Sequence, residues 1–165
     1  MKKKLQKLLK NQKGLTLVEL LAVVVILGII AAIAVPSIAN IIDNSKKDAH
    51  IANAEQLVGA ARLAVAANDK KLWGTDNSAT AGQITMQELV DGGYLEAAIE
   101  DPDNNDETPS YETAYVDIKT ANDNKGKVTY EVYLKGDERS VAKSSTAKTT
   151  AVAPSDLTRD NVVNN

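Results

Sequence analysis

The stretch Leu20–Val35 reads LLAVVVILGIIAAIAV, and it decides the fold of this 165-residue chain. Every residue in it is apolar or Gly, and apolar residues continue on both sides. A helix needs about 20 mostly apolar residues to cross a membrane. Residues 15–39 meet that length with three polar residues among them, Thr16, Glu19 and Ser37. The sequence therefore predicts a membrane-spanning helix over 15–39.

A basic leader precedes the apolar stretch. Residues 1–14 carry six lysines and no acid, and the next lysine is Lys46. Because positive charge is retained on the cytoplasmic side of a membrane, this asymmetry predicts a cytoplasmic amino terminus and an exported remainder. The whole chain has 19 basic and 22 acidic residues, so the part that follows the leader is acidic.

Composition excludes several functional classes. The chain has no Cys, which rules out disulfides, Cys-ligated zinc, a Cys nucleophile and a lipidated Cys anchor. A net charge of −3 without a basic, aromatic-rich stripe argues against direct nucleic-acid binding. The sequence has no G-x-S-x-G, no phosphate-binding Gly loop and no H-E-x-x-H. His50, the single His, is expected at the surface or an interface rather than as a ligand. We therefore expect neither an enzyme nor a cofactor.

Three interpretations compete for the apolar segment. In the first, it is a secretory signal peptide, and cleavage after Ala34 releases a soluble secreted binding protein. In the second, it is an ordinary single-pass anchor. Neither accounts for Lys13–Glu19 (KGLTLVE), which places Gly14 at the front of the apolar run and Glu19 inside it. A carboxylate in a spanning helix costs roughly 2.5–3.5 kcal/mol on insertion scales, less near a helix end, so Glu19 is a functional hypothesis.

The third interpretation is that this motif resembles the processing site of the type IV pilin and pseudopilin family, in which the chain is cut after the Gly and methylated at the new amino terminus. The resemblance is specific over residues 13–36 and implies Gly14 and Leu15 as processing residues, although most of the family has Phe where this chain has Leu15. It also implies an assembly role for Thr16 and Glu19, in which Glu19 faces the amino terminus of a neighbouring subunit. Thr16 and Glu19 equally form a capping-box pattern, worth about 1 kcal/mol at a helix start, and both roles stay open.

Gly28 and Pro36 lie inside the apolar helix. In a helix interior Gly costs about 1 kcal/mol and Pro about 3 kcal/mol. Pro36 also removes the hydrogen bond to the carbonyl of Ala32. A tolerated kink in a membrane helix explains both residues. The resemblance implies a further role, because in pilins a helix-breaking pair at this spacing bounds a segment that unwinds in the filament.

Helical signals continue past the apolar stretch to about Asn68. A capping-box pattern at Thr85–Glu88, followed by a Gly pair, predicts a short helix. Apolar and polar residues alternate over 113–119 and 127–135, which is the pattern of two half-buried strands joined as a hairpin. Residues 143–154 lack periodicity and bulky apolar residues, and the region 137–165 is therefore predicted to be a flexible polar tail.

The expected fold is α+β and pilin-like: a long amino-terminal helix carries a small antiparallel β head. The first half of the helix is expected to span the membrane and the second half to be amphipathic. The predicted organisation is a leader that processing removes (1–14), a transmembrane and filament-core helix (15–39), its amphipathic continuation (40–68), a head with a short helix and a β-hairpin (69–136), and a flexible polar tail (137–165).

An acidic segment gives a weak metal motif. Positions one, three, five and twelve of a calcium-loop pattern are occupied by Asp101, Asp103, Asn105 and Glu112. Asp106 stands where that loop needs Gly, so an acidic turn is the preferred interpretation, with calcium as the alternative. Some secretion pseudopilins bind calcium in a nearby loop.

The leading functional hypothesis is a structural subunit of a type IV pilus-like filament, cleaved after Gly14. Its partners would be further copies of itself, the membrane before assembly and, as the resemblance implies, a prepilin peptidase, a membrane assembly platform and a cytoplasmic ATPase. It would be a single-pass membrane protein before assembly and part of an extracellular filament afterwards. The alternative in the same class is a pseudopilin of a type II secretion or DNA-uptake (competence) system. The alternative in another class is the secreted binding protein released after Ala34.

Overall fold

The computed structural model describes residues 16–67, 82–104, 110–120, 128–143 and 150–165. The chain divides into an amino-terminal unit, Met1–Ile42, and a carboxy-terminal unit, Asp43–Asn165. Helix α2, Leu17–Ala66, contributes residues to both units. Its bounds confirm the long helix expected from Thr16 to about Asn68.

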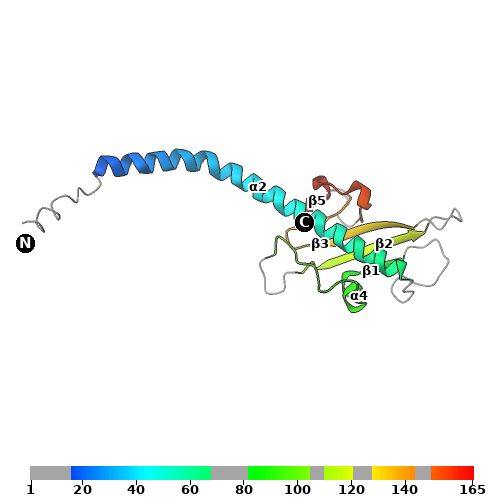
Figure 1. Ribbon diagram of the computed structural model, residues 1–165. Coiled ribbons are helices and arrows are strands. Elements are labelled where there is room, and N and C mark those ends of the chain that lie inside the picture. The colour runs from blue at the N-terminus through cyan, green and yellow to red at the C-terminus, as the bar shows by residue number, and fades with distance from the viewer. Residues whose placement is uncertain (1–15, 68–81, 105–109, 121–127, 144–149) are drawn as a thin grey trace, which may run out of the picture. The chain divides into compact units, whose positions relative to one another are not determined.

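The carboxy-terminal unit contains a five-stranded antiparallel sheet in the order β1-β2-β3-β4-β5 (Figure 1). The strands are β1 Gly82–Thr85, β2 Thr113–Thr120, β3 Val128–Lys135, β4 Arg139–Val141 and β5 Val162–Asn164. Neighbours in sequence are neighbours in the sheet, as short connections favour. The remaining elements are helix α4, Met86–Asp91, and two 3-10 turns, Pro154–Asp156 and Arg159–Asn161. The α+β, pilin-like fold class is confirmed.

The predicted hairpin is formed by β2 and β3. Val116 pairs with Val132, and Tyr115 pairs with Tyr133. The two tyrosine rings lie 5.1 Å apart between centroids, so they are a cross-strand pair as the alternation suggested. The loop that joins the two strands lies outside the described residues.

The predicted short helix is α4. The Oγ1 of Thr85 accepts a hydrogen bond from the backbone N–H of Glu88, and the Glu88 carboxylate accepts one from the backbone N–H of Thr85. This reciprocal pair satisfies two donors at the start of the helix. Gly93 ends the turn with φ +75°, a conformation that L side chains rarely adopt.

The two faces of the sheet have different packing. On one face, alternate strand residues such as Val116, Val132 and Leu134 pack with the buried residues of α2, among them Leu57. On the other face, Tyr133 packs in a second cluster with Ala142, Ala151 and Val163. Helix α2 therefore packs on one face of the sheet, and the small Tyr133 cluster lies on the other face.

The prediction of a flexible polar tail over 137–165 is wrong for the part of it that the structure describes. Strands β4 and β5 extend the sheet, with Val141 and Val162 in the core. The side-chain amide of Asn165 donates to the carbonyls of Gly136 and Asp137. A few scattered valines are sufficient here because short strands need only alternate residues to be apolar.

Candidate functional site

The amino end of α2 carries the predicted capping box. The Oγ1 of Thr16 accepts from the backbone N–H of Glu19 at 3.2 Å. The Glu19 Oε2 accepts from both the backbone N–H and the hydroxyl of Thr16 at 2.9 Å. The carboxylate also adds negative charge at the positive end of the helix dipole. Gly14 and Leu15, the predicted processing residues, lie outside the described residues.

The part of α2 in the amino-terminal unit is apolar on all sides. Its large apolar side chains from Leu17 to Ile42 are between 49% and 80% exposed. This stretch is long and apolar enough to cross a membrane. A helix with no polar face is stable only inside lipid or a protein core. We call Leu17–Ile42 the exposed apolar helix.

Gly28 and Pro36 both lie within the exposed apolar helix, and α2 is helical at each of them. A Cβ at Gly28 would meet nothing within 4 Å. The expected unwinding concerns a filament, and it stays a prediction.

Residues 9–35 match the family described as the prokaryotic N-terminal methylation motif. The amino-terminal segment is a prepilin-type methylation motif. This match confirms the resemblance to type IV pilins and pseudopilins that was inferred from KGLTLVE. The matched residues include the apolar stretch Leu20–Val35.

The fimbrial protein EcpC of Eikenella corrodens is 36% identical to this chain over 90 residues. The matched region is 53% of this chain and 54% of that relative, so the chain spans about half of the relative's length. No solved structure matches the chain significantly. Together, the motif and the fimbrial relative support a pilin-like structural subunit.

The carboxy-terminal unit contains a buried polar cluster beneath α2. We define it as Lys46, His50, Asp101, Asp103, Tyr111 and Arg139. The His50 ring is fully buried and contacts Asp103 Oδ2 through Nε2 at 2.9 Å and the Tyr111 hydroxyl through Nδ1 at 2.8 Å. The expectation that His50 lies at the surface or an interface is therefore wrong. Its position on the buried face of α2, four residues before Ala54 and seven before Leu57, was the signal for burial.

Two cations compensate the charge of Asp103. Lys46 Nζ lies 3.0 Å from its Oδ1, and Arg139 Nε lies 3.6 Å from its Oδ2. Burial works to raise the pKa of Asp103, but the hydrogen bonds from His50 and Lys46 and the charge of Arg139 outweigh it and hold the pKa below its usual value. Asp103 is therefore held ionised in a buried site.

Asn53 and Asp43 extend the cluster along α2. The Asn53 side-chain amide donates to the carbonyl of Glu100 at 2.8 Å and to the Tyr111 hydroxyl at 3.1 Å. Asp43 accepts a hydrogen bond from Arg139, so helix, loop and sheet are joined by side chains. Burial raises the pKa of the Tyr111 phenol, which keeps its hydroxyl neutral.

Of the calcium candidates that the structure describes, Asp101, Asp103 and Glu112, only the first two lie close together. Asp101 and Asp103 lie in the buried polar cluster, whereas Glu112 is exposed and forms an ion pair with Lys135. Asn105 lies outside the described residues. Calcium binding stays an untested prediction.

Among the described residues, His50, Asp101 and Asp103 form a group whose ligand atoms lie within 4.8 Å of one another. The ammonium of Lys46 and the guanidinium of Arg139 both contact the carboxylate of Asp103. Positive charge is therefore already supplied by the protein where a metal ion would have to bind.

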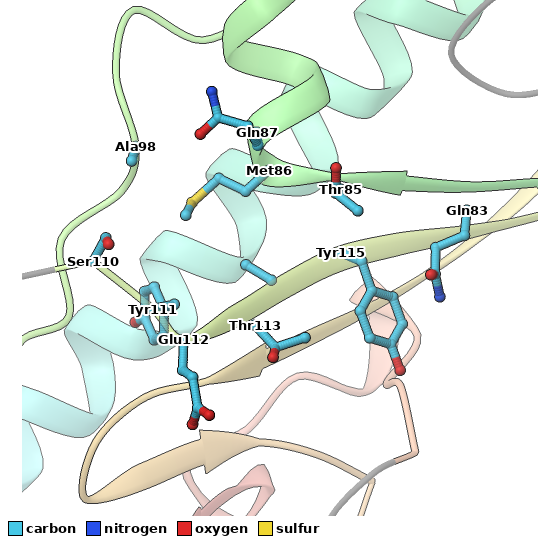
Figure 2. Close-up of a pocket in the computed structure, with 11 residues that line it drawn as sticks. Gln83, Thr85, Met86, Gln87, Ala98, Ser110, Tyr111, Glu112, Thr113 and Tyr115 are labelled. Atoms are coloured by element: carbon cyan, nitrogen blue, oxygen red, sulfur yellow. The ribbon is translucent and has the colours of Figure 1, made fainter.

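A pocket of about 410 Å³ opens between the start of α4 and the beginning of β2. Figure 2 shows Met86 and Gln87 on one side of it and Tyr111, Thr113 and Tyr115 on the other. Glu112 is the single acidic residue in its lining. The Glu112 carboxylate forms an ion pair with Lys135.

Proposed function

We propose that this chain is a structural subunit of a type IV pilus-like filament, cleaved after Gly14 and assembled through the exposed apolar helix. One observation carries the proposal: the methylation motif over residues 9–35 overlaps the exposed apolar helix, Leu17–Ile42, in which every large apolar side chain is exposed. Apolar surface of this extent is unfavourable in water. Lipid would cover it before assembly, and copies of the same helix would cover it afterwards.

Processing would remove the basic leader and leave Leu15 as the new amino terminus. A Gly at the cleavage point suits a protease that must bind an extended, unhindered backbone. The prepilin peptidase that the motif implies would also methylate the Leu15 amine. The leader lysines would hold the amino terminus in the cytoplasm until then.

Assembly would bring the amine of Leu15 close to the Glu19 carboxylate of a neighbouring subunit. In an apolar surrounding, opposite charges attract strongly, and such a pair selects one register between otherwise featureless helices. A contact of this kind joins different surfaces of two copies, so repetition gives a filament rather than a closed oligomer. An assembly platform and a cytoplasmic ATPase would extract each subunit from the membrane.

The proposed role is structural rather than enzymatic. Glu112 in the pocket lining forms an ion pair with Lys135, and Asp103 in the buried polar cluster pairs with Lys46 and Arg139. Both features are consistent with a subunit whose chemistry is limited to processing of its amino terminus.

The mass of the mature amino terminus, measured on protein recovered from the cell surface, tests the proposal. A chain that begins at methylated Leu15 supports it. A chain that begins at Val35 supports the secreted binding protein instead, and an intact leader supports a plain anchor. Gly14→Val should block cleavage, whereas Asn11→Ala in the same leader should not.

Electron microscopy of the cell surface separates a pilin from a pseudopilin. Loss of all filaments on deletion of the gene supports a main filament subunit. Filaments that persist, together with a defect in protein export or DNA uptake, support a pseudopilin of a secretion or competence system.

A further inference from the structure

Met86 is the first residue of helix α4, and its thioether accepts a hydrogen bond from the backbone. The N–H of Ile99 donates to Met86 Sδ across 3.3 Å. Both residues belong to the core of the carboxy-terminal unit, where Met86 is 8% exposed. Because Ile99 lies 13 residues further along the chain, this bond attaches the loop that follows α4 to the start of the helix.

The same side chain lines the pocket of about 410 Å³ beside α4. Figure 2 shows it extending from the helix toward Ala98, Ser110 and Tyr111, which line the same pocket. A water molecule needs only about 15 Å³ of such space, and hydrogen peroxide is only slightly larger. A small oxidant in the pocket can therefore reach the Met86 thioether, although the residue is packed in the core.

The hydrogen bond distinguishes the two faces of the sulfur. A thioether sulfur has one lone pair on each face of its C–S–C plane, and an oxidant reacts with a lone pair. At Met86 one face is engaged by the N–H of Ile99, so an oxidant cannot approach there. The other face remains for a molecule in the pocket. Since a methionine sulfoxide is chiral at sulfur, attack at one face gives one epimer.

Oxidation would also change the hydrogen bond itself. The free lone pair of Sδ attacks one oxygen of hydrogen peroxide, the S–O bond forms, and the O–O bond breaks. The departing hydroxide takes up the proton of the transferred oxygen and leaves as water. The thioether is oxidised by two electrons and the peroxide is reduced. The sulfur of a sulfoxide is positively polarised and accepts hydrogen bonds poorly, so the buried N–H of Ile99 would lose its acceptor.

We propose that Met86 is an oxidation site, at which peroxide in the pocket forms one sulfoxide epimer and releases Ile99 from the start of α4. A methionine sulfoxide reductase specific for that epimer would reverse the change. The chain has no Cys, so Met1 and Met86 are its two sulfur-containing residues, and Met1 lies in the leader. The inference concerns the carboxy-terminal unit and does not depend on the proposed filament.

The test treats the full chain in detergent with hydrogen peroxide and follows Met86 sulfoxide by mass spectrometry of its peptide. Met86 should react within about tenfold of its rate in the chain unfolded by guanidinium chloride. After digestion, two reductases that each accept one epimer identify the product. One of them should reduce at least about three quarters of the sulfoxide from the folded chain, but only about half of that from the unfolded chain.

Amide hydrogen exchange measures the loss of the bond to sulfur. In the oxidised chain, exchange at Ile99 should accelerate by about tenfold, while exchange in β3 changes little. Met86→Leu is the matched control, because it keeps the apolar volume, removes the acceptor and does not react with peroxide. This variant should show the faster exchange at Ile99 before peroxide is added and no further change afterwards.

Three results would overturn the proposal. A rate for Met86 that is more than about tenfold below that of the unfolded chain would show that the pocket does not give access to the sulfur. A smaller share of one epimer from the folded chain would show that the N–H of Ile99 does not block one face. Unchanged exchange at Ile99 after oxidation would show that the bond to sulfur does not hold this loop.

Discussion

Asp101 Oδ2 accepts a hydrogen bond from the backbone N–H of Asp137 at 2.8 Å, which ties the loop after Glu100 to the turn between β3 and β4. The other oxygen of the same carboxylate accepts from the backbone N–H of Asp103 at 3.0 Å. Gly136 lies directly against Asp101. A Cβ added at Gly136 would collide with that carboxylate and lie 2.8 Å from the carbonyl oxygen of Arg139.

Gly136→Ala should therefore destabilise the carboxy-terminal unit, because backbone and a buried carboxylate cannot move aside cheaply. We expect the free energy of unfolding to fall by about 1–3 kcal/mol, measured by denaturant titration of the full chain in detergent. Gly59→Ala is the matched control. Its Cβ would meet nothing within 4 Å inside α2, so the helix should gain up to about 1 kcal/mol. Equal effects of the two changes would contradict this account.

The sequence predicted those helices and strands that are marked by a pattern of neighbouring residues, such as a capping box or an alternation of apolar and polar residues. The capping box at Thr85 and Glu88 located α4, and the alternation through Val116 and Val132 located the hairpin. Strand β1 was missed because a strand of four residues with one buried side chain, Ile84, carries no visible period.

Thr85→Ala should loosen α4. It removes the side-chain acceptor for the backbone N–H of Glu88 and costs about 1 kcal/mol. Amide hydrogen exchange within Met86–Asp91 should accelerate, while exchange in β3 changes little. Gln87→Ala on the same helix removes an exposed hydrogen bond to Asp91 and should alter exchange far less. Similar exchange in both variants would show that the cap does not hold this helix.

The buried polar cluster was beyond the reach of sequence reasoning for a different reason. Its partners are distant in sequence, with His50 and Asp103 53 residues apart and Asp43 and Arg139 96 apart. No spacing rule links such residues. The sequence shows that Asp101 and Asp103 are acidic, but it does not show that Lys46 and Arg139 contact Asp103.

The stability of the carboxy-terminal unit should depend on pH through Asp103. Its pKa is lower in the folded chain than the ordinary value of about 3.9, so folding favours the ionised form. That stabilisation is present above about pH 4 and is lost as the pH falls through the lower, folded pKa. Asp103→Asn should lower the free energy of unfolding at pH 7 by about 1–3 kcal/mol. In this variant, the free energy of unfolding should also decrease less between pH 5 and pH 2 than in the unchanged chain. Denaturant titrations at each pH measure both effects. Asp156→Asn, at an exposed position, should keep the slope of the unchanged chain.

Glu19→Ala tests assembly separately from folding. The Thr16 capping box would be lost at a cost of about 1 kcal/mol, which the long α2 helix tolerates. Cleavage after Gly14 and membrane insertion should proceed, but the yield of surface filaments should fall sharply because the partner of the Leu15 amine is gone. Thr16→Ala is the control, since it removes the cap and keeps the carboxylate. Normal filament yield with Glu19→Ala would remove the assembly role.

Val162 tests whether the carboxy-terminal segment belongs to the core. It is 6% exposed, pairs with Val141 and packs in the same cluster as Leu134 and Leu57. Val162→Ala should lower the free energy of unfolding by about 1–3 kcal/mol because it removes buried apolar surface and leaves a cavity. Asn164→Ala, at an exposed position in the same strand, should change it by less than about 0.5 kcal/mol. If both variants unfold at the same denaturant concentration as the unchanged chain, β5 contributes nothing to the core, and the segment behaves as the tail that its composition suggested.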